Sequence, residues 1–200
     1  EEINMYQDNP MMHVENVNEE LVFAGSTLGW QIIGGKPQIR AMTRGQIVAY
    51  WQKFYHPKNM VLSIAGKVSR RDQQRISKYF DRPFGAPYRK HTFRVFQSNQ
   101  QYWQRRAMHR DSDQVQLALG WPSFGYHHPQ QYAANLLSVI LGGTMSSRLF
   151  IEVREKRGLA YSVRASNSPY QDSGCLMIQA GLDKKRWRTA VEVMLATGLI

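Results

Sequence analysis

The stretch from Leu141 to Tyr161, LGGTMSSRLFIEVREKRGLAY, limits the possible folds more than any other part of the sequence. The pair Gly142-Gly143 is expected to end one helix, because glycine reaches left-handed backbone conformations at little energetic cost. Gly158 is expected to end a second helix, and a strand follows directly. The chain therefore turns twice within this stretch and passes from helix to helix to strand.

The second helix of this stretch is expected to be amphipathic. A hydroxyl at Thr144 or Ser146 can accept hydrogen bonds from the free N–H groups at its start. Its apolar side chains recur at helical spacing and should face a core. They are Leu149, Phe150 and Val153.

Arg154 and Tyr161 are seven residues apart across the expected turn. The end of a helix and the start of a strand could direct this guanidinium and this phenol to the same place, which would suit a site that grips a peptide backbone. A simpler interpretation is also open, since an Arg on a charged helix face is usually solvated and a Tyr in the first turn of a strand is usually half-buried. Spacing alone does not decide between the two.

A chain of 200 residues with 42% hydrophobic side chains can bury a real core, as one large domain or two small ones. No apolar run approaches the roughly 18 to 20 residues of a membrane span, so we expect none. Cys175 is the single cysteine, which excludes an intramolecular disulfide and favours a reducing compartment such as the cytoplasm or the mitochondrial matrix. Because the sequence starts inside a helical pattern at Glu1, without an initiator Met, we expect a fragment of a longer protein.

The net charge of +11 is distributed unevenly. Residues 1–60 carry five Lys and Arg against six Asp and Glu, whereas residues 61–200 carry 21 against nine. The basic residues are scattered, as at Arg105-Arg106, and no nucleic-acid-binding motif accompanies them. We interpret them as solvated faces and expect no nucleic-acid partner; a basic nucleic-acid binder with salt-dependent affinity stays as a third alternative.

The first 80 residues have the periodicities of an α/β unit. Residues 1 to about 24 are expected to be helical, with Pro10 as a start, a kink or a break. A glycine-rich connection follows over residues 25–37. Residues 60–68 alternate in polarity and are rich in branched side chains, which predicts a strand.

Two capping boxes mark further helices in this part of the chain. Thr43 with Gln46 opens one helix, and Ser69 with Asp72 opens another that runs to residue 80. The helix after Thr43 should bury an apolar stripe. Its members are Ile47, Tyr50, Trp51 and Phe54.

A connector is predicted next, because the segment DRPFGAPY at residues 81–88 has two prolines, a glycine and no clear periodicity. We place the domain boundary at residues 81–90. Beyond it, strands are expected at 92–97, 102–109, 114–120, 160–165 and 175–182, and helices at 129–141, in the stretch described first and from residue 183. This order predicts an α+β fold whose mainly antiparallel sheet carries helices on one face.

The sequence contains no local motif of a complete active site. Its six histidines form neither an i, i+4 pair nor H-x-x-E-H, whereas a catalytic zinc ion needs three protein ligands. Nucleophile and nucleotide motifs are missing too, and Cys175 lies in an apolar strand where it should behave as a small hydrophobe. We therefore expect that this chain cannot build a metal site alone.

Four segments together resemble the pitrilysin/insulinase superfamily of zinc metallopeptidases, most closely its processing-peptidase-like subgroup. EEINMYQDNP at 1–10 is similar to the family's EEIxMxxDxP helix, and LGWQIIGG at 28–35 is similar to its PLGxxIxG loop. FYHPKNMVLSIAGKV at 54–68 resembles YxPxNMVLxxxGxV, and LGGTMSSRLFIEVREKRGLAYSV at 141–163 resembles LGGGxSSRLFxxVREKxGLAYSV. The segments come in the family's order and run through most of the chain.

The resemblance implies two homologous two-layer α/β halves that close like a clamshell around a chamber, both incomplete in this chain. Residues 1–80 would belong to the first, catalytic half, residues 81–90 to the linker and residues 91–200 to the second, substrate-gripping half. In the family, an inverted H-x-x-E-H helix binds zinc and supplies the general base. That helix should lie upstream of Glu1, so the isolated fragment is expected to be inactive.

The resemblance also assigns roles to individual residues. Glu2 matches the family's third zinc ligand, so zinc is the expected cofactor of the intact protein and not of this fragment alone. Arg154 and Tyr161 match the pair that reaches the substrate backbone or the developing oxyanion. Gly142 and Gly143 belong to the glycine loop that is expected to bind substrate.

The leading hypothesis is a fragment of a zinc metalloendopeptidase that cleaves peptides or unfolded protein segments in a closed chamber. The expected partners are a peptide substrate and a second subunit, in a homodimer or in a heterodimer with another superfamily member. Some members lack the zinc motif. The alternative is therefore a non-catalytic member that binds peptides or scaffolds an active partner.

Overall fold

The computed structural model describes residues 1–81, 88 and 92–199. Contacts divide the chain into two compact units, one made of Glu1–Gly35 with Val95–Ile200 and the other of Lys36–Arg94. Most of the connector expected at residues 81–90 lies outside the described residues. The first unit thus draws on both ends of the sequence.

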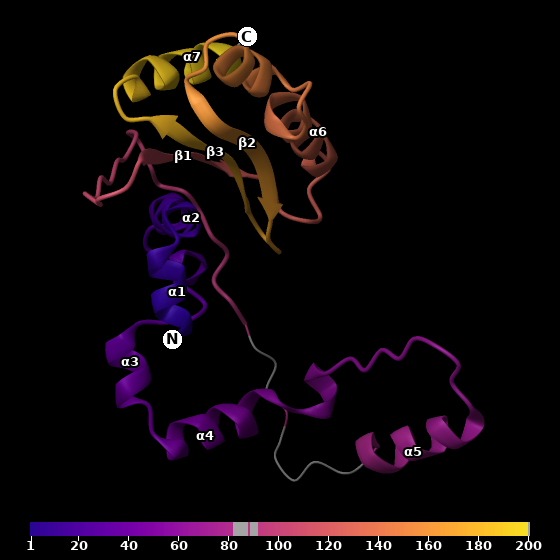
Figure 1. The fold of residues 1–200 in the computed structure, drawn as a ribbon. Helices are drawn as coiled ribbons and strands as arrows, with labels where there is room; N and C mark the ends of the chain where they lie inside the picture. Colours follow the sequence, from indigo (N-terminus) through magenta and orange to yellow (C-terminus); the bar gives the residue numbers. More distant parts are fainter. Residues whose placement is uncertain (82–87, 89–91, 200) are drawn as a thin grey trace. The chain divides into compact units, whose positions relative to one another are not determined.

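A three-stranded antiparallel sheet forms the centre of the first unit (Figure 1). Its strands are β1 (Gln114–Ser123), β2 (Ala160–Pro169) and β3 (Gly174–Asp183). They lie in the order β1-β3-β2, so the last strand in sequence is the central one. The α+β class and the antiparallel sheet expected from the sequence are confirmed.

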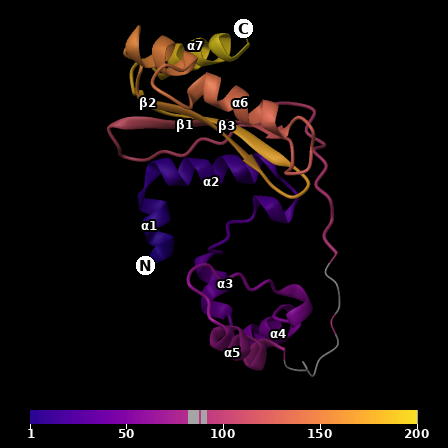
Figure 2. The same ribbon diagram turned by 90° about the vertical axis from the view of Figure 1, so that its right-hand side faces the viewer.

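Helices cover one face of this sheet. They are α6 (Gln131–Gly142), the π-helical turn η3 (Phe150–Glu155) and α7 (Trp187–Leu199), and Figure 2 shows α6 and α7 on the same side of the strands. Leu149, Val153 and Leu182 are fully buried between the two layers. Burial of a large aliphatic side chain contributes about 1.5–3 kcal/mol, so these residues hold the segment of η3 on the sheet.

The opposite face of the sheet carries α2 (Pro10–Val22), which follows α1 (Glu2–Asp8) and precedes the 3-10 turn η1 (Thr27–Gly29) (Figure 2). Cys175 and Met177 of β3 pack there against Val22 and Phe23. The central strand is therefore buried on both faces. No helix in the described part of the chain is long and apolar enough to cross a membrane.

Asn9 separates α1 from α2. Its Oδ1 accepts hydrogen bonds from the backbone N–H groups of Met11 and Met12, at 3.1 and 3.2 Å. Pro10 occupies the first position of α2, where the missing N–H costs no helical hydrogen bond. Of the three outcomes expected for Pro10, a helix start is confirmed.

Polar contacts also fasten α2 to the sheet. Gln179, in β3, is 1% exposed; its Nε2 donates to the carbonyl of Met11 at 2.6 Å and its Oε1 accepts from Nε of Arg164 at 2.7 Å. Tyr170 donates its hydroxyl to Oε1 of Glu19 at 2.6 Å, and burial with this acidic partner raises the pKa of Tyr170. The interface of α2 with the sheet is thus specified by hydrogen bonds as well as by apolar packing.

The second unit contains α3 (Lys36–Ala41), α4 (Arg44–Phe54), the 3-10 turn η2 (Pro57–Asn59) and α5 (Arg70–Phe80). Both expected capping boxes are confirmed, with Thr43 and Gln46 opening α4 and Ser69 and Asp72 opening α5. The hydroxyl and the N–H of Ser69 donate to Asp72 and hold the pKa of its carboxyl below the usual value. Such caps form between near neighbours in sequence and need no distant partner.

The buried stripe expected on α4 is wrong. Ile47, Tyr50 and Trp51 are each more than half exposed, at 54%, 60% and 51%, and Phe54 is only partly buried. Helical periodicity marks an apolar face, but that face is buried only where a second layer meets it. The described residues of this unit supply no sheet for α4 to cover.

Three of the expected strands are also wrong. Residues 60–68, 92–97 and 102–109 are all described, and none of them forms a strand. Val61 is 97% exposed, which is the opposite of a half-buried strand position. An alternating pattern becomes a strand only when a neighbour takes up its backbone N–H and C=O groups. The three strands that form do so by pairing with one another.

Candidate functional site

The turn η3 begins the candidate site. Its backbone hydrogen bonds span five residues, as in the 2.9 Å bond from the N–H of Lys156 to the carbonyl of Ile151. The expected apolar stripe is confirmed, since Leu149 and Val153 are fully buried and Phe150 is partly buried. π-helical turns are rare and occur frequently at functional sites.

The backbone after η3 is fixed from two sides. Gly158 has φ = 56°, in the left-handed region that favours glycine, which confirms the expected helix end. Its N–H donates to the carbonyl of Arg154, and the N–H of Leu159 donates to the carbonyl of Val153, both at 2.9 Å. Arg186, directly before α7, donates from its Nη2 to the carbonyl of Gly158 at 2.8 Å. The path from η3 into β2 is therefore rigidly defined.

Tyr161 occupies an irregular position at the start of β2. Ala160 pairs with Leu182 and Ser162 pairs with Gly181, which leaves Tyr161 without a partner of its own on β3. An extra residue of this kind bends the strand and redirects its side chain. The side chain of Tyr161 is 57% exposed, so the half-buried position weighed from the sequence is wrong.

Arg154 is exposed and lies over the ring of Phe150, with Cζ 4.8 Å from the ring centroid. The nearby acid Glu152 is engaged by Nζ of Lys156 at 2.6 Å and by Arg157. These two hydrogen-bonded cations hold the pKa of Glu152 below its usual value. Within the described part of the chain, Arg154 has no carboxylate partner. Its N–H donors are accordingly available to a ligand.

The pair Gly142 and Gly143 ends α6 for a reason that differs from the expectation. Neither residue has positive φ, and the left-handed conformation expected there is wrong. A Cβ on Gly142 would lie 2.3 Å from the backbone N of Ala165, and one on Gly143 would lie 2.7 Å from Cα of Val139. Glycine is needed at Gly142 because α6 ends in close contact with β2, and at Gly143 because the chain folds back onto Val139 of α6 itself. The expected contact of these glycines with substrate stays a prediction.

The hydroxyl cap expected at the start of the second helix is wrong. Oγ1 of Thr144 and Oγ of Ser146 lie 3.0 Å apart and bond to each other. No side chain caps η3, whose first residue follows Leu149 in an α-helical conformation. The helical segment begins only at Arg148, and the two hydroxyls are engaged with each other rather than with its first N–H groups.

Glu2, the expected metal ligand, lies in the first turn of α1 and is exposed. α1 leads into α2, on the face of the sheet opposite α6 and α7 (Figure 2). The described residues contain no group of three or more His, Cys, Asp and Glu that could hold a metal ion. The structure thus places Arg154 and Tyr161 at the two ends of one turn and leaves Glu2 apart from them.

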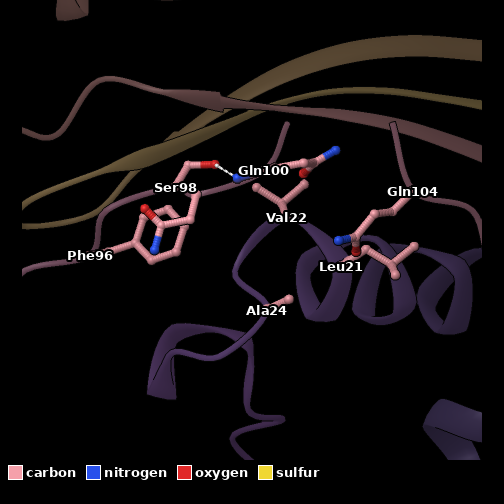
Figure 3. A pocket seen from close by; sticks show the side chains of 8 residues that line it. Leu21, Val22, Ala24, Phe96, Ser98, Gln100 and Gln104 are labelled. Atoms are coloured by element: carbon pink, nitrogen blue, oxygen red, sulfur yellow. Dashed lines mark hydrogen bonds between the residues drawn. The ribbon is translucent and has the colours of Figure 1, made fainter. Parts of the chain in front are cut away.

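A small pocket of about 190 Å³ lies at the end of α2 (Figure 3). Ser98 accepts a hydrogen bond there from the N–H of Gln100, at 3.5 Å. Neither an acid nor a base lines the pocket, so it offers no group for proton transfer near neutral pH. Its lining residues are Leu21, Val22, Ala24, Phe96, Ser98, Asn99, Gln100 and Gln104. None of the residues expected to form a site is among them.

Cys175 is 2% exposed, and burial is the main cause that raises the pKa of its thiol to about 12. Nδ2 of Asn18 donates to its Sγ at 3.7 Å. A thiol that stays protonated is a poor nucleophile. The expected role of Cys175 as a small hydrophobe is therefore confirmed.

Sequence reasoning missed two contacts that build this site. It assigns Phe150 only to the core and Arg186 only to a solvated face. The four-residue spacing from Phe150 to Arg154 is a signal that could have indicated the first contact, because residues four apart on a helix are neighbours. The second contact joins Arg186 to Gly158 across 28 residues, and no local pattern marks it.

Comparison with known proteins gives matches over most of the chain. The profile of the family described as "Peptidase M16 inactive domain" matches residues 41–198. The chain is 32% identical over 181 residues to the uncharacterized zinc protease YmxG of Bacillus subtilis, and 36% identical over 181 residues to an uncharacterized zinc protease of Rickettsia bellii. Each match covers 90% of this chain and 43% of the relative. The chain therefore spans less than half the length of these relatives.

Solved structures share the fold. The peptidase M16 inactive domain from Pseudomonas fluorescens superposes with a TM-score of 0.81 at 23% identity, over 97% of this chain and 47% of that one. A protease from Helicobacter pylori gives 0.79 at 23% identity, over 93% and 47%. A structure of complex III2 from Candida albicans gives 0.76 at 15% identity, over 91% and 45%. At these identities the likeness concerns the fold alone.

Proposed function

Because the chain belongs to the peptidase M16 family, we propose that it is part of a zinc metalloendopeptidase in which η3 and the start of β2 grip the substrate. The observation that carries the proposal is the pair Arg154 and Tyr161, two exposed side chains at the ends of one braced turn. The zinc proteases among the relatives support the reaction class. The intact polypeptide would cleave peptides or unfolded segments in a closed chamber.

The chemistry of the two side chains suits a peptide backbone. A guanidinium presents N–H donors in a fixed plane, and a phenol presents one O–H donor. Donors that are fixed before the reaction, and directed at the oxygen on which negative charge develops, lower the barrier to peptide hydrolysis. The hydrogen bonds of Gly158 and Leu159 to the end of η3 restrict the backbone between the donors.

The described residues do not fit a zinc site by themselves, since they include no cluster of three ligand-type side chains. In this proposal Glu2 contributes one ligand in the intact protein. The other ligands would come from the H-x-x-E-H helix that the sequence resemblance implies outside this chain. The contribution of the second half is contact with the substrate.

The proposal extends to the organisation of the intact protein. Residues 1–80 would complete the first half, residues 81–90 would form the linker and residues 91–200 would begin the second half. A longer polypeptide is needed, because the chain spans 43% of each of the two relatives. We also propose that two such subunits act together, as a homodimer or with another superfamily member.

The direct test is to express the intact protein with zinc and to assay cleavage of an unstructured peptide, beside the variant Glu2→Gln. Removing an anionic ligand while keeping its size should lower both the bound zinc and the cleavage rate. The rate should fall by at least the roughly 10–100-fold that is typical even for partners of metal ligands. The neighbouring substitution Glu1→Gln is the matched control. Full zinc content and activity in Glu2→Gln would remove Glu2 from the metal site.

A second candidate function is a non-catalytic member that binds peptides or scaffolds an active partner. The description of the matching family as an inactive domain favours it for residues 41–198. Arg154 and Tyr161 would then bind a peptide that is not cut. Saturable peptide binding by the intact, zinc-supplemented protein without any cleavage would support this candidate against the first.

A further inference from the structure

We infer that Phe150 is a positioning residue that directs Arg154, and that the pairing of Glu152 with Lys156 and Arg157 leaves Arg154 free of acids so that it meets a bound peptide. The inference rests on the proposed function, because it requires a peptide that Arg154 contacts. The inference is about the side-chain conformation of Arg154. The hydrogen bonds described above fix the backbone of the turn instead.

Two cations that follow η3 occupy the acid Glu152. Glu152 binds Lys156, four residues on, and Arg157, five residues on. Arg157 also donates to the carbonyl of Glu152 at 2.8 Å. Lys156 and Arg157 come directly after the end of η3, and both side chains reach back to Glu152. Glu152 is thereby occupied by two cations, and Arg154 is left without an acid in the described structure.

Phe150 supplies the contact that Arg154 does have. The distance of 4.8 Å from Cζ to the ring centroid lies within the roughly 6 Å of a cation–π interaction. The ring itself is held in place, because Phe150 packs partly buried against the core that includes Leu149 and Val153. A guanidinium has five N–H donors, so contact with one ring leaves donors available for carbonyl oxygens.

The contact of Arg154 with Phe150 completes a site whose backbone is held by hydrogen bonds. Gly158 and Arg186 define the path between Arg154 and Tyr161, so the side-chain torsions of Arg154 are the freedom that remains. Ordering a long side chain on binding lowers affinity. A side chain that is ordered before the ligand arrives avoids this loss. Phe150 should therefore affect how tightly a peptide binds.

The test is a double-mutant cycle in the intact protein, stripped of zinc with a chelator. Affinity for a fluorescein-labelled unstructured peptide is measured by anisotropy for the wild type, Phe150→Leu, Arg154→Ala and the double variant. Phe150→Leu keeps apolar bulk and removes the ring face, so binding should weaken by about 2- to 30-fold, the range of a cation–π contact. In the Arg154→Ala background the same change should add almost nothing. Phe150→Tyr, which keeps the ring, should bind as the wild type does.

The controls separate positioning from packing. Trp187→Leu removes a comparable cation–π contact on α7, where Cζ of Arg188 lies 5.4 Å from the ring centroid, and it should leave peptide affinity unchanged. If Phe150→Leu lowers the unfolding temperature, Phe150→Met takes its place in the cycle. Equal losses of affinity with and without Arg154 would overturn the inference, because they would indicate packing alone.

Cleavage by the zinc-loaded protein distinguishes this inference from the proposed function. A wild type that binds the peptide without cutting it would contradict the peptidase proposal. A loss of affinity on Phe150→Leu that depends on Arg154 would still support the role of Phe150. If the protein cleaves the peptide but Phe150→Leu lowers affinity equally with and without Arg154, only the role of Phe150 is overturned. A wild type that neither binds nor cleaves would overturn both.

Discussion

Tyr161 and Cys175 are ionisable side chains on the same sheet, and their surroundings expose the first to solvent and bury the second. Tyr161 lies at an unpaired position of β2 and is 57% exposed. Cys175 lies on the central strand and is 2% exposed. Access to a ligand is therefore decided by the position of each residue in the sheet rather than by its residue type.

Replacing Tyr161 by Phe in the intact protein removes one O–H donor and keeps the ring. If this hydroxyl stabilises the developing oxyanion, kcat should fall by about 10²–10³-fold, as for loss of one such donor elsewhere. The unfolding temperature should not change, because the side chain is 57% exposed. Tyr132→Phe on α6, at an 80% exposed position, is the control. A wild-type kcat in Tyr161→Phe would exclude the hydroxyl from the mechanism.

Cys175 should be protected from thiol reagents in the folded chain. Burial raises the pKa of its thiol from 9.0 to about 12. The protonated thiol therefore contributes stability that is fully present below pH 9 and is lost as the pH rises toward 12. A colorimetric thiol reagent at about pH 8 should react only after unfolding by denaturant. Rapid reaction of the native chain would contradict the buried position.

At the scale of elements, the sequence predicts features that depend on residues close together in the chain. It fails for features that depend on contact with a second element. The capping boxes of α4 and α5 join residues three apart, and both form. Gly158 ends the helical segment as expected, and it does so in a left-handed conformation. Gly142 ends α6 too, but its reason is the backbone of β2, and no pattern around Gly142 identifies that neighbour. Tyr50 likewise belongs to an apolar stripe, and no pattern in the sequence indicates whether a second layer covers it.

Gly142→Ala and Gly198→Ala form a matched pair at the ends of two helices. A Cβ on Gly142 would lie 2.3 Å from the N of Ala165, so the free energy of unfolding should fall by about 1–3 kcal/mol, as for overpacked cores. A Cβ on Gly198 would meet nothing within 4 Å. Its replacement should be neutral or should stabilise α7 by up to about 1 kcal/mol. Urea denaturation measures both, and equal effects would contradict the close contact of α6 with β2.

At the scale of the first unit, contacts between distant segments determine the arrangement. Met11 and Gln179 are 168 residues apart and share a hydrogen bond. A buried Gln in a strand is unusual, and neither its pattern nor its spacing identifies a helix from the start of the chain as its partner. The resemblance predicts the α+β class and the pair Arg154 and Tyr161. It does not predict which face of the sheet α2 covers.

Gln179→Met tests whether that hydrogen-bonded contact holds α2 on the sheet. The substitution keeps the volume and leaves the carbonyl of Met11 and Nε of Arg164 without their buried partner. A typical hydrogen bond contributes about 0.5–1.5 kcal/mol and two are removed, so the free energy of unfolding should fall by about 1–3 kcal/mol. Amide hydrogen exchange should accelerate in α2 and not in α7.

Gln116→Met is the matched control for this change, on β1. Oε1 of Gln116 is buried and has no hydrogen-bond partner among the described residues, so its removal should cost much less than the removal of Gln179. Equal costs for the two substitutions, with unchanged exchange in α2, would mean that the apolar contacts at the end of α2 hold it. The hydrogen bonds of Gln179 would then specify the register of α2 without stabilising it.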